Sequence, residues 1–207
     1  MDNHRYLPKG EAMHISLQKI CAIVIILGSV LFLIAAFSPI SHRVFPEPSA
    51  ARKLEVITAT PTAWIVAQIF FALGALVTVI GIALVGYRFR DQSFALLLQA
   101  SVAVLVLGAL LWIWYLFMRT VDPAAFAEGS LPLWALILYF VLTEAGLAVF
   151  GAALLRSALR AWVGWLVIGS MVLFFVLTLI MRDMVPLFYY VITLLTGVML
   201  YGHNRKV

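Results

Sequence analysis

The sequence contains a single cysteine, Cys21, which lies inside an apolar segment. One cysteine cannot form an intramolecular disulfide, and it supplies too few thiolates for a structural zinc or iron–sulfur site. A disulfide framework and a cysteine-based metal centre are therefore excluded. We expect Cys21 to act as a small apolar side chain between helices.

Charged residues are also scarce, at 11%, whereas 65% of the residues are hydrophobic and the mean hydropathy is +1.10. Soluble domains carry about 25% charged residues, so water is not the solvent for most of this surface. The net charge of +5 does not indicate nucleic-acid binding, because the basic residues occur singly or in pairs at the ends of apolar segments. The expected surroundings are a lipid bilayer.

Histidines and catalytic motifs are missing from the apolar segments. His4, His14, His42 and His203 all lie outside them, which excludes haem ligated by two histidines inside a membrane. The sequence has no HExxH, GxSxG, P-loop or GxGxxG motif. We therefore assign no catalytic residue, no metal ligand and no cofactor, and an intramembrane enzyme is the least favoured class of function.

Long apolar segments dominate what remains. A helix needs about 20 apolar residues to cross a bilayer, and the sequence has six such segments, at 17–37, 62–86, 94–118, 133–155, 162–181 and 184–202. Arg182, Asp183 and Pro186 separate the last two into a tight hairpin. The prediction is an all-α, polytopic bundle of six transmembrane helices that forms one integral membrane domain over residues 1–207.

The distribution of basic residues predicts the orientation of this bundle. Nine of the 14 Lys and Arg residues lie on the side of the bundle that holds the two termini, and five lie on the opposite side. The side richer in Lys and Arg is cytoplasmic. Both termini are therefore expected on the cytoplasmic side of the cell (cytoplasmic or inner) membrane.

Two external loops contain helix signals. Pro46 and Pro48 precede the segment 49–57, which could form a short helix lying on the outer surface, although a plain connector fits this segment equally well. Asp122 and Pro123 can start a second short helix that stops near Gly129. Segments 38–57 and 122–129 would together form the external face, with Arg119 and Asp122 as a surface ion pair.

Small residues and a weak internal repeat suggest how the helices pack. Sliding 61–90 onto 131–160 gives eight identities in thirty, which a parallel duplication of the second and fourth spans or apolar composition alone would explain. Glycines spaced five residues apart are expected to let helices approach closely. These pairs are Gly81/Gly86, Gly146/Gly151, Gly164/Gly169 and Gly197/Gly202.

Glu144 is the ionisable residue deepest in a predicted span. It lies 12 residues beyond Pro132, which places it about 18 Å along its helix and near the bilayer midplane. A carboxylate there costs roughly 3 kcal/mol, so we expect Glu144 to be neutral, hydrogen-bonded or paired with a cation. Gln68, Gln99 and Tyr139 are the candidate partners in a ligand site, and a purely structural hydrogen bond and a proton-relay role are the alternatives.

The last 60 residues or so carry one resemblance. Gly151-Ala-Ala-Leu-Leu-Arg is followed by a basic turn with Trp162-Val-Gly-Trp165, and a final helix runs from Pro186 to Gly197. This pattern resembles small bacterial multi-pass membrane proteins of unassigned function. The resemblance implies a bacterial membrane protein and no particular activity.

Three classes of function follow from these features. Short loops and few polar residues in the spans favour a non-catalytic subunit, an assembly factor or a structural partner of other membrane protein subunits. Glu144 favours a small-molecule or lipid binder or carrier. The third class, an intramembrane enzyme, lacks an identifiable nucleophile and base.

Overall fold

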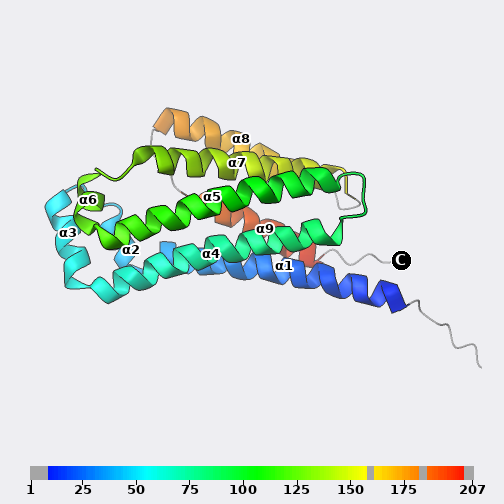
Figure 1. Ribbon diagram of the computed structural model, residues 1–207, viewed down its shortest axis with the longest axis horizontal. Helices are drawn as coiled ribbons and strands as arrows, with labels where there is room; N and C mark the ends of the chain where they lie inside the picture. Colours follow the sequence, from blue (N-terminus) through cyan, green and yellow to red (C-terminus); the bar gives the residue numbers. More distant parts are fainter. Residues whose placement is uncertain (1–8, 158–160, 182–185, 203–207) are drawn as a thin grey trace, which may run out of the picture.

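The computed structural model describes residues 9–157, 161–181 and 186–202, and the described residues form nine helices. Six of these helices are long and lie roughly side by side (Figure 1). They are α1 (Lys9–Ala36), α4 (Pro61–Arg88), α5 (Ala95–Val121), α7 (Leu133–Leu155), α8 (Ala161–Met181) and α9 (Leu187–Gly202). Each coincides within a few residues with one of the apolar segments, except that α1 begins eight residues before its segment.

Four helical segments are long and apolar enough to cross a membrane: Leu17–Ala36, Pro61–Arg88, Ala95–Val121 and Leu133–Leu155. Two further apolar helical segments, Ala161–Leu177 and Leu187–Gly202, are shorter. The 16 residues of α9 extend about 24 Å, which is less than the roughly 30 Å of hydrocarbon in a bilayer. The chain is a helical membrane protein.

The six long helices form a closed ring. Each packs against the next in the order α1, α4, α5, α7, α8 and α9, and α9 returns to α1. The α8–α9 pair is the least closely packed, so α8 is held mainly by α7. Aromatic and aliphatic side chains from the ring fill its interior, including Phe32, Trp112, Tyr139 and Tyr190.

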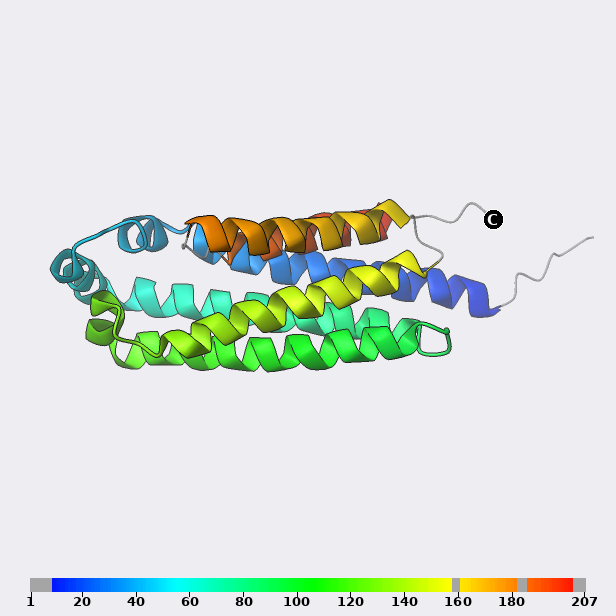
Figure 2. The same ribbon diagram turned by 90° about the horizontal axis from the view of Figure 1, so that it is seen from above.

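Three short helices cover one end of the ring (Figures 1 and 2). They are α2 (Pro39–Val44), α3 (Ala50–Ala59) and α6 (Pro123–Glu128). Ser49 caps α3 and Asp122 caps α6, and α6 ends at Gly129 with a left-handed φ of 72°. The short helices predicted over 49–57 and 122–129 are confirmed, whereas α2 was not predicted.

Close backbone contacts join α1 to α4. A β-carbon at Gly74 would lie 2.6 Å from the Phe32 nitrogen, and one at Gly28 would collide with the Thr78 backbone. Of the predicted glycines, Gly81, Gly146, Gly151, Gly164 and Gly197 do lie at tight helix contacts. Gly169 and Gly202 have open space beside them. In those two pairs only Gly164 and Gly197 lie at a close helix contact.

The two ends of the described chain lie at the same end of the ring, opposite the three short helices (Figure 2). The proposed duplication relates α4 to α7, which are not neighbours in the ring. The two aligned tryptophans differ in their surroundings, because Trp64 is buried and Trp134 is 59% exposed. The duplication stays a prediction.

Candidate functional site

The site is centred on Glu144, which lies midway along α7 and is half-buried. The hydroxyl of Tyr189 on α9 donates a hydrogen bond of 2.8 Å to its Oε1. No Lys or Arg forms an ion pair with Glu144 in the described part of the chain, where the single ion pair is that of Arg90 with Asp91. The prediction that Glu144 would be hydrogen-bonded is met by this tyrosine.

A small cavity of about 30 Å³ lies beside Tyr189, and Glu144 is not among the residues that line it. Such a volume holds about two ordered water molecules, or one small ion with a water. Side chains from α4, α5, α7 and α9 line it. Its polar lining consists only of hydroxyl-bearing residues: Thr78, Tyr139, Thr143, Tyr189, Tyr190 and Thr193.

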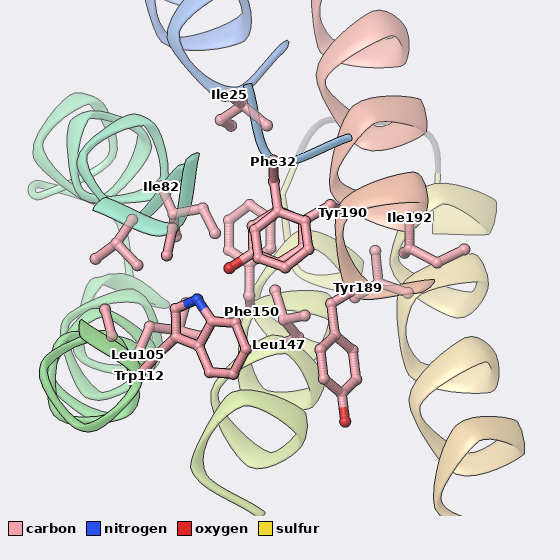
Figure 3. Close-up of a cluster of buried hydrophobic side chains, with 14 of the residues drawn as sticks. Ile25, Phe32, Ile82, Leu105, Trp112, Leu147, Phe150, Tyr189, Tyr190 and Ile192 are labelled. Atoms are coloured by element: carbon pink, nitrogen blue, oxygen red, sulfur yellow. The ribbon is translucent and has the colours of Figure 1, made fainter. Parts of the chain in front are cut away.

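The rings around the cavity form one packed aromatic cluster. Tyr190 stacks on Phe32 with ring centroids 3.5 Å apart, and Tyr139 stacks on Trp112 at 4.6 Å. In Figure 3 the indole nitrogen of Trp112 points toward the side occupied by Phe32 and Tyr190, while the Tyr189 hydroxyl points away from them. Tyr189 therefore directs its hydroxyl to a different part of the interior from Tyr190.

Two polar groups in this cluster lack a hydrogen-bond partner of good geometry among the described residues. They are the Tyr139 hydroxyl and the Trp112 indole nitrogen. The Tyr139 hydroxyl lies close to Tyr190 and Thr143. Buried polar groups normally have a partner, so the interior has spare hydrogen-bonding capacity next to the cavity.

The four candidate residues from the sequence do not form one site. Glu144 and Tyr139 lie on the same helix and belong to the region described above. Gln68 is buried on α4, but it does not line the cavity, and both of its side-chain amide atoms lack partners among the described residues. Gln99 is exposed near the start of α5 and does not face the cavity.

Sequence reasoning missed Tyr189 and Tyr190. Tyr189 follows the last loop by only a few residues, a position that by itself is typical of a tyrosine at the membrane interface. The α8–α9 end stops short of the ends of α4 and α5 (Figure 2), so the first turn of α9 already lies deep in the bundle. The shortness of α9, which the sequence shows, is the signal that would have indicated this depth.

The arrangement offers oxygen ligands and no nucleophile–base pair. No group of three or more His, Cys, Asp and Glu residues comes together in the described ranges. A carboxyl with tyrosine and threonine hydroxyls is a donor set that suits a hard cation or an ammonium group. This set does not suit a soft transition metal.

Arg119 requires a correction. It was predicted to form a surface ion pair with Asp122, but its side chain is only 8% exposed and Asp122 instead accepts a hydrogen bond from the Ala125 backbone. The cause is α6, which folds back over the end of α5 and places Phe126 on the guanidinium. Arg182 and Asp183, for which the sequence predicts a similar surface ion pair, lie outside the described residues.

Comparisons with protein-family models, curated proteins and solved structures give no match. The resemblance of the last 60 residues to small bacterial membrane proteins stays a prediction. The function is therefore inferred from the geometry of the chain itself.

Proposed function

We propose that this chain is a membrane-embedded binding protein or carrier for a small monovalent cation or a primary ammonium group. The observation that carries the proposal is the Glu144–Tyr189 pair, whose tyrosine also lines a small cavity with five other hydroxyl-bearing residues. An unpaired carboxyl deep in a membrane helix is costly, and a cation compensates it directly. Tyr189 connects the Glu144 carboxyl to the cavity, because it binds Glu144 and also lines the cavity.

Size and chemistry favour a small cation over a lipid. The cavity of about 30 Å³ admits an ion and a water, whereas an acyl chain needs far more room. Alkali cations bind to oxygen ligands, and the polar lining provides only hydroxyl oxygens. Tyr139 has hydrogen-bonding capacity to spare, so its hydroxyl oxygen is a suitable additional ligand.

The same proposal includes six membrane spans with both termini in the cytoplasm of a bacterial cell. It is supported by six apolar helices and by the positions of the two ends of the described chain at one end of the ring. Lys19, Arg88, Arg90 and Arg156 lie toward that end. The positive-inside rule makes it the cytoplasmic side of the inner membrane.

The test is cation-dependent stability of the purified protein in a zwitterionic bilayer. The unfolding midpoint is measured in NaCl, KCl, methylammonium chloride and choline chloride at equal ionic strength. Because a ligand that binds only the folded state stabilises it, one small cation should raise the midpoint over choline. Glu144→Gln should remove this shift and leave the midpoint in choline close to wild type.

Thr120→Val is the matched control, because the Thr120 hydroxyl bonds only to the Leu116 carbonyl within α5 and does not line the cavity. It should retain the cation-dependent shift. The proposal fails if no cation stabilises the wild type over choline, or if Glu144→Gln responds to cations as the wild type does.

A second candidate is a non-catalytic subunit or assembly partner of a membrane complex. The ordered cover made by α2, α3 and α6 favours it, because this is the largest structured surface outside the long helices. Replacing 122–129 with a Gly/Ser linker should release a partner that copurifies in stoichiometric amount. A protein that purifies alone at native abundance would contradict this candidate.

A further inference from the structure

Arg119 lies at the covered end of the ring inside a box of four aromatic rings. Its guanidinium carbon is 4.4 Å from the ring centre of Phe126, 5.0 Å from Phe45, 5.2 Å from Tyr115 and 5.6 Å from Trp112. The side chain forms no ion pair within the described part of the chain. The box therefore holds a buried cation with no carboxylate beside it.

Aromatic faces stabilise the charge of a guanidinium but leave its hydrogen-bond donors unused. Cation–π contacts act on the ring face, whereas the five N–H groups of arginine lie in its plane and require acceptor atoms. The Nε of Arg119 is enclosed and has no acceptor among the described residues. The four rings explain why the cation lies here, but they provide no acceptor atoms for its N–H groups.

A further unpartnered polar side chain lies on the α4 face that packs toward the same box. The side-chain amide of Gln68 is buried, and neither its nitrogen nor its oxygen has a partner in the described ranges. Gln68 follows Trp64 by one helical turn, and the Trp64 indole donates to the Arg119 carbonyl oxygen at 3.3 Å. Three residues beyond Gln68, Phe71 packs on Trp112 and Phe45, so Gln68 lies between two residues that contact the box.

We propose that the Arg119 box is a binding site for an oxyanion, presented either by an anionic lipid headgroup or by a free phosphate. An oxyanion supplies several acceptor oxygens to a cluster that offers mainly N–H donors, and a guanidinium binds such a group through two parallel hydrogen bonds. The approach is from the covered end, where Phe45 is 40% exposed at the rim of the box. This site is separate from the cation site at Glu144 and does not depend on it.

One basic side chain of the cover lies close to the box. Lys53 on α3 lies over the ring of Phe126, with its Nζ 5.6 Å from the ring centre. Phe126 is thus in contact with two cations, one buried and one at the surface. Lys53 would attract an anion to the rim, and Arg119 would bind it.

The test measures anion-dependent stability with two separate probes. In phosphatidylcholine nanodiscs, the unfolding midpoint is compared in sodium phosphate and in sodium chloride at equal ionic strength. In a second arm, chloride is kept and part of the lipid is replaced by phosphatidylglycerol. A rise in the first arm identifies a free phosphate, and a rise in the second identifies a lipid headgroup.

Arg119→Lys and Gln68→Met are the informative variants. Lys keeps the charge but loses the planar fork, so binding of the effective probe should weaken about tenfold or more. Met replaces an unpartnered amide with an apolar group of similar size, so Gln68→Met should be at least as stable as the wild type without probe and should respond less to it. Arg52→Gln, an exposed arginine of α3, is the control and should respond as the wild type does.

The proposal is overturned if neither probe stabilises the wild type. It is also overturned if Arg119→Lys and Gln68→Met both bind the effective probe as tightly as the wild type. Should Arg119→Lys not fold, Gln68→Met alone still decides, because its fold does not depend on a hydrogen bond of the lost amide.

Discussion

The Tyr189 hydroxyl donates a hydrogen bond of 2.8 Å to Glu144 Oε1 and joins two helices that are not neighbours in the ring. Helix α8 lies between α7 and α9 in the packing order, and its own contact with α9 is slight. This one side-chain bond therefore links α7 to α9 across the least closely packed part of the bundle. Tyr189 also lines the cavity, so stability and ligand binding are expected to depend on this tyrosine.

Tyr189→Phe should destabilise the protein. The variant keeps the ring and its contacts with Phe140 and Phe174 but leaves the half-buried carboxyl of Glu144 without its donor. The expected loss is about 1–2 kcal/mol, the usual range for a buried group that loses its hydrogen bond. Buried Cys21 provides the measurement, because a thiol-reactive dye labels it only when the bundle opens.

Glu144→Gln should be close to wild type in the same assay, since an amide oxygen still accepts from Tyr189. Glu144→Ala leaves a void and an unpartnered hydroxyl, and it should lose stability as Tyr189→Phe does. Equal stability of all four proteins would contradict the role given to this bond. A Gln variant that is stable yet fails to complement a deletion strain would separate function from folding.

Gly74→Ala should force α1 and α4 apart. The added β-carbon would lie 2.6 to 2.8 Å from backbone and β-carbon atoms of Phe32, which are not the movable end of a side chain. Overpacking of this kind costs about 1–3 kcal/mol. The measurement is the midpoint of Cys21 labelling during a detergent or heat titration.

Gly169→Ala is the matched control for that substitution. Nothing lies within 4 Å of a β-carbon at this position. Alanine should be neutral or slightly stabilising there, because it favours the helix over glycine. Equal effects of the two substitutions would show that helix propensity, and not the α1–α4 contact, determines the result.

The sequence predicted features that depend on local chemistry. Apolar length located the long helices, and Asp122, Pro123 and Gly129 specified α6 through its cap, its first residue and its left-handed end. Counting residues from Pro132 also placed Glu144 midway along α7. Each of these features is decided by residues a few positions apart.

The sequence did not predict contacts that depend on how the helices are rotated and offset. Tyr189 reaches Glu144 because α9 begins deep in the bundle, and Gln99 faces outward because of the rotation of α5. Arg119 is buried because α6 folds over it, although its place at the end of an apolar segment is typical of a surface residue. Such features depend on the relative positions of elements distant in the sequence.

The proposed orientation can be tested with cysteines placed at exposed positions at both ends of the ring. Ala51→Cys and Ser130→Cys lie at the covered end, and Ser93→Cys lies between α4 and α5 at the other. In intact cells a membrane-impermeant maleimide should label the first two, and it should label Ser93→Cys only after permeabilisation. The reverse pattern would invert the orientation, and buried Cys21 should contribute little background.

The last prediction concerns Ser29 on α1 and Thr193 on α9, whose hydroxyl oxygens lie 2.8 Å apart. Each hydroxyl also has a carbonyl acceptor on its own helix, at Ile25 for Ser29 and at Tyr190 for Thr193. One hydroxyl donates across the interface while the other donates to its own carbonyl, so removing either one leaves the other still able to donate locally. Ser29→Ala and Thr193→Val should each cost about 0.5–1 kcal/mol, and the double variant should lose roughly 0.6 kcal/mol less than their sum.

The control for this cycle pairs Thr193→Val with Ser101→Ala. The Ser101 hydroxyl donates to the Gly146 carbonyl at 2.8 Å and joins α5 to α7, so it shares no partner with Thr193. These two substitutions should be additive. Additivity in the Ser29 cycle as well would mean that the two hydroxyls do not interact. Because Thr193 also lines the cavity, a stabilising cation that uses its hydroxyl should change the Ser29–Thr193 coupling and leave the Ser101 control unaffected.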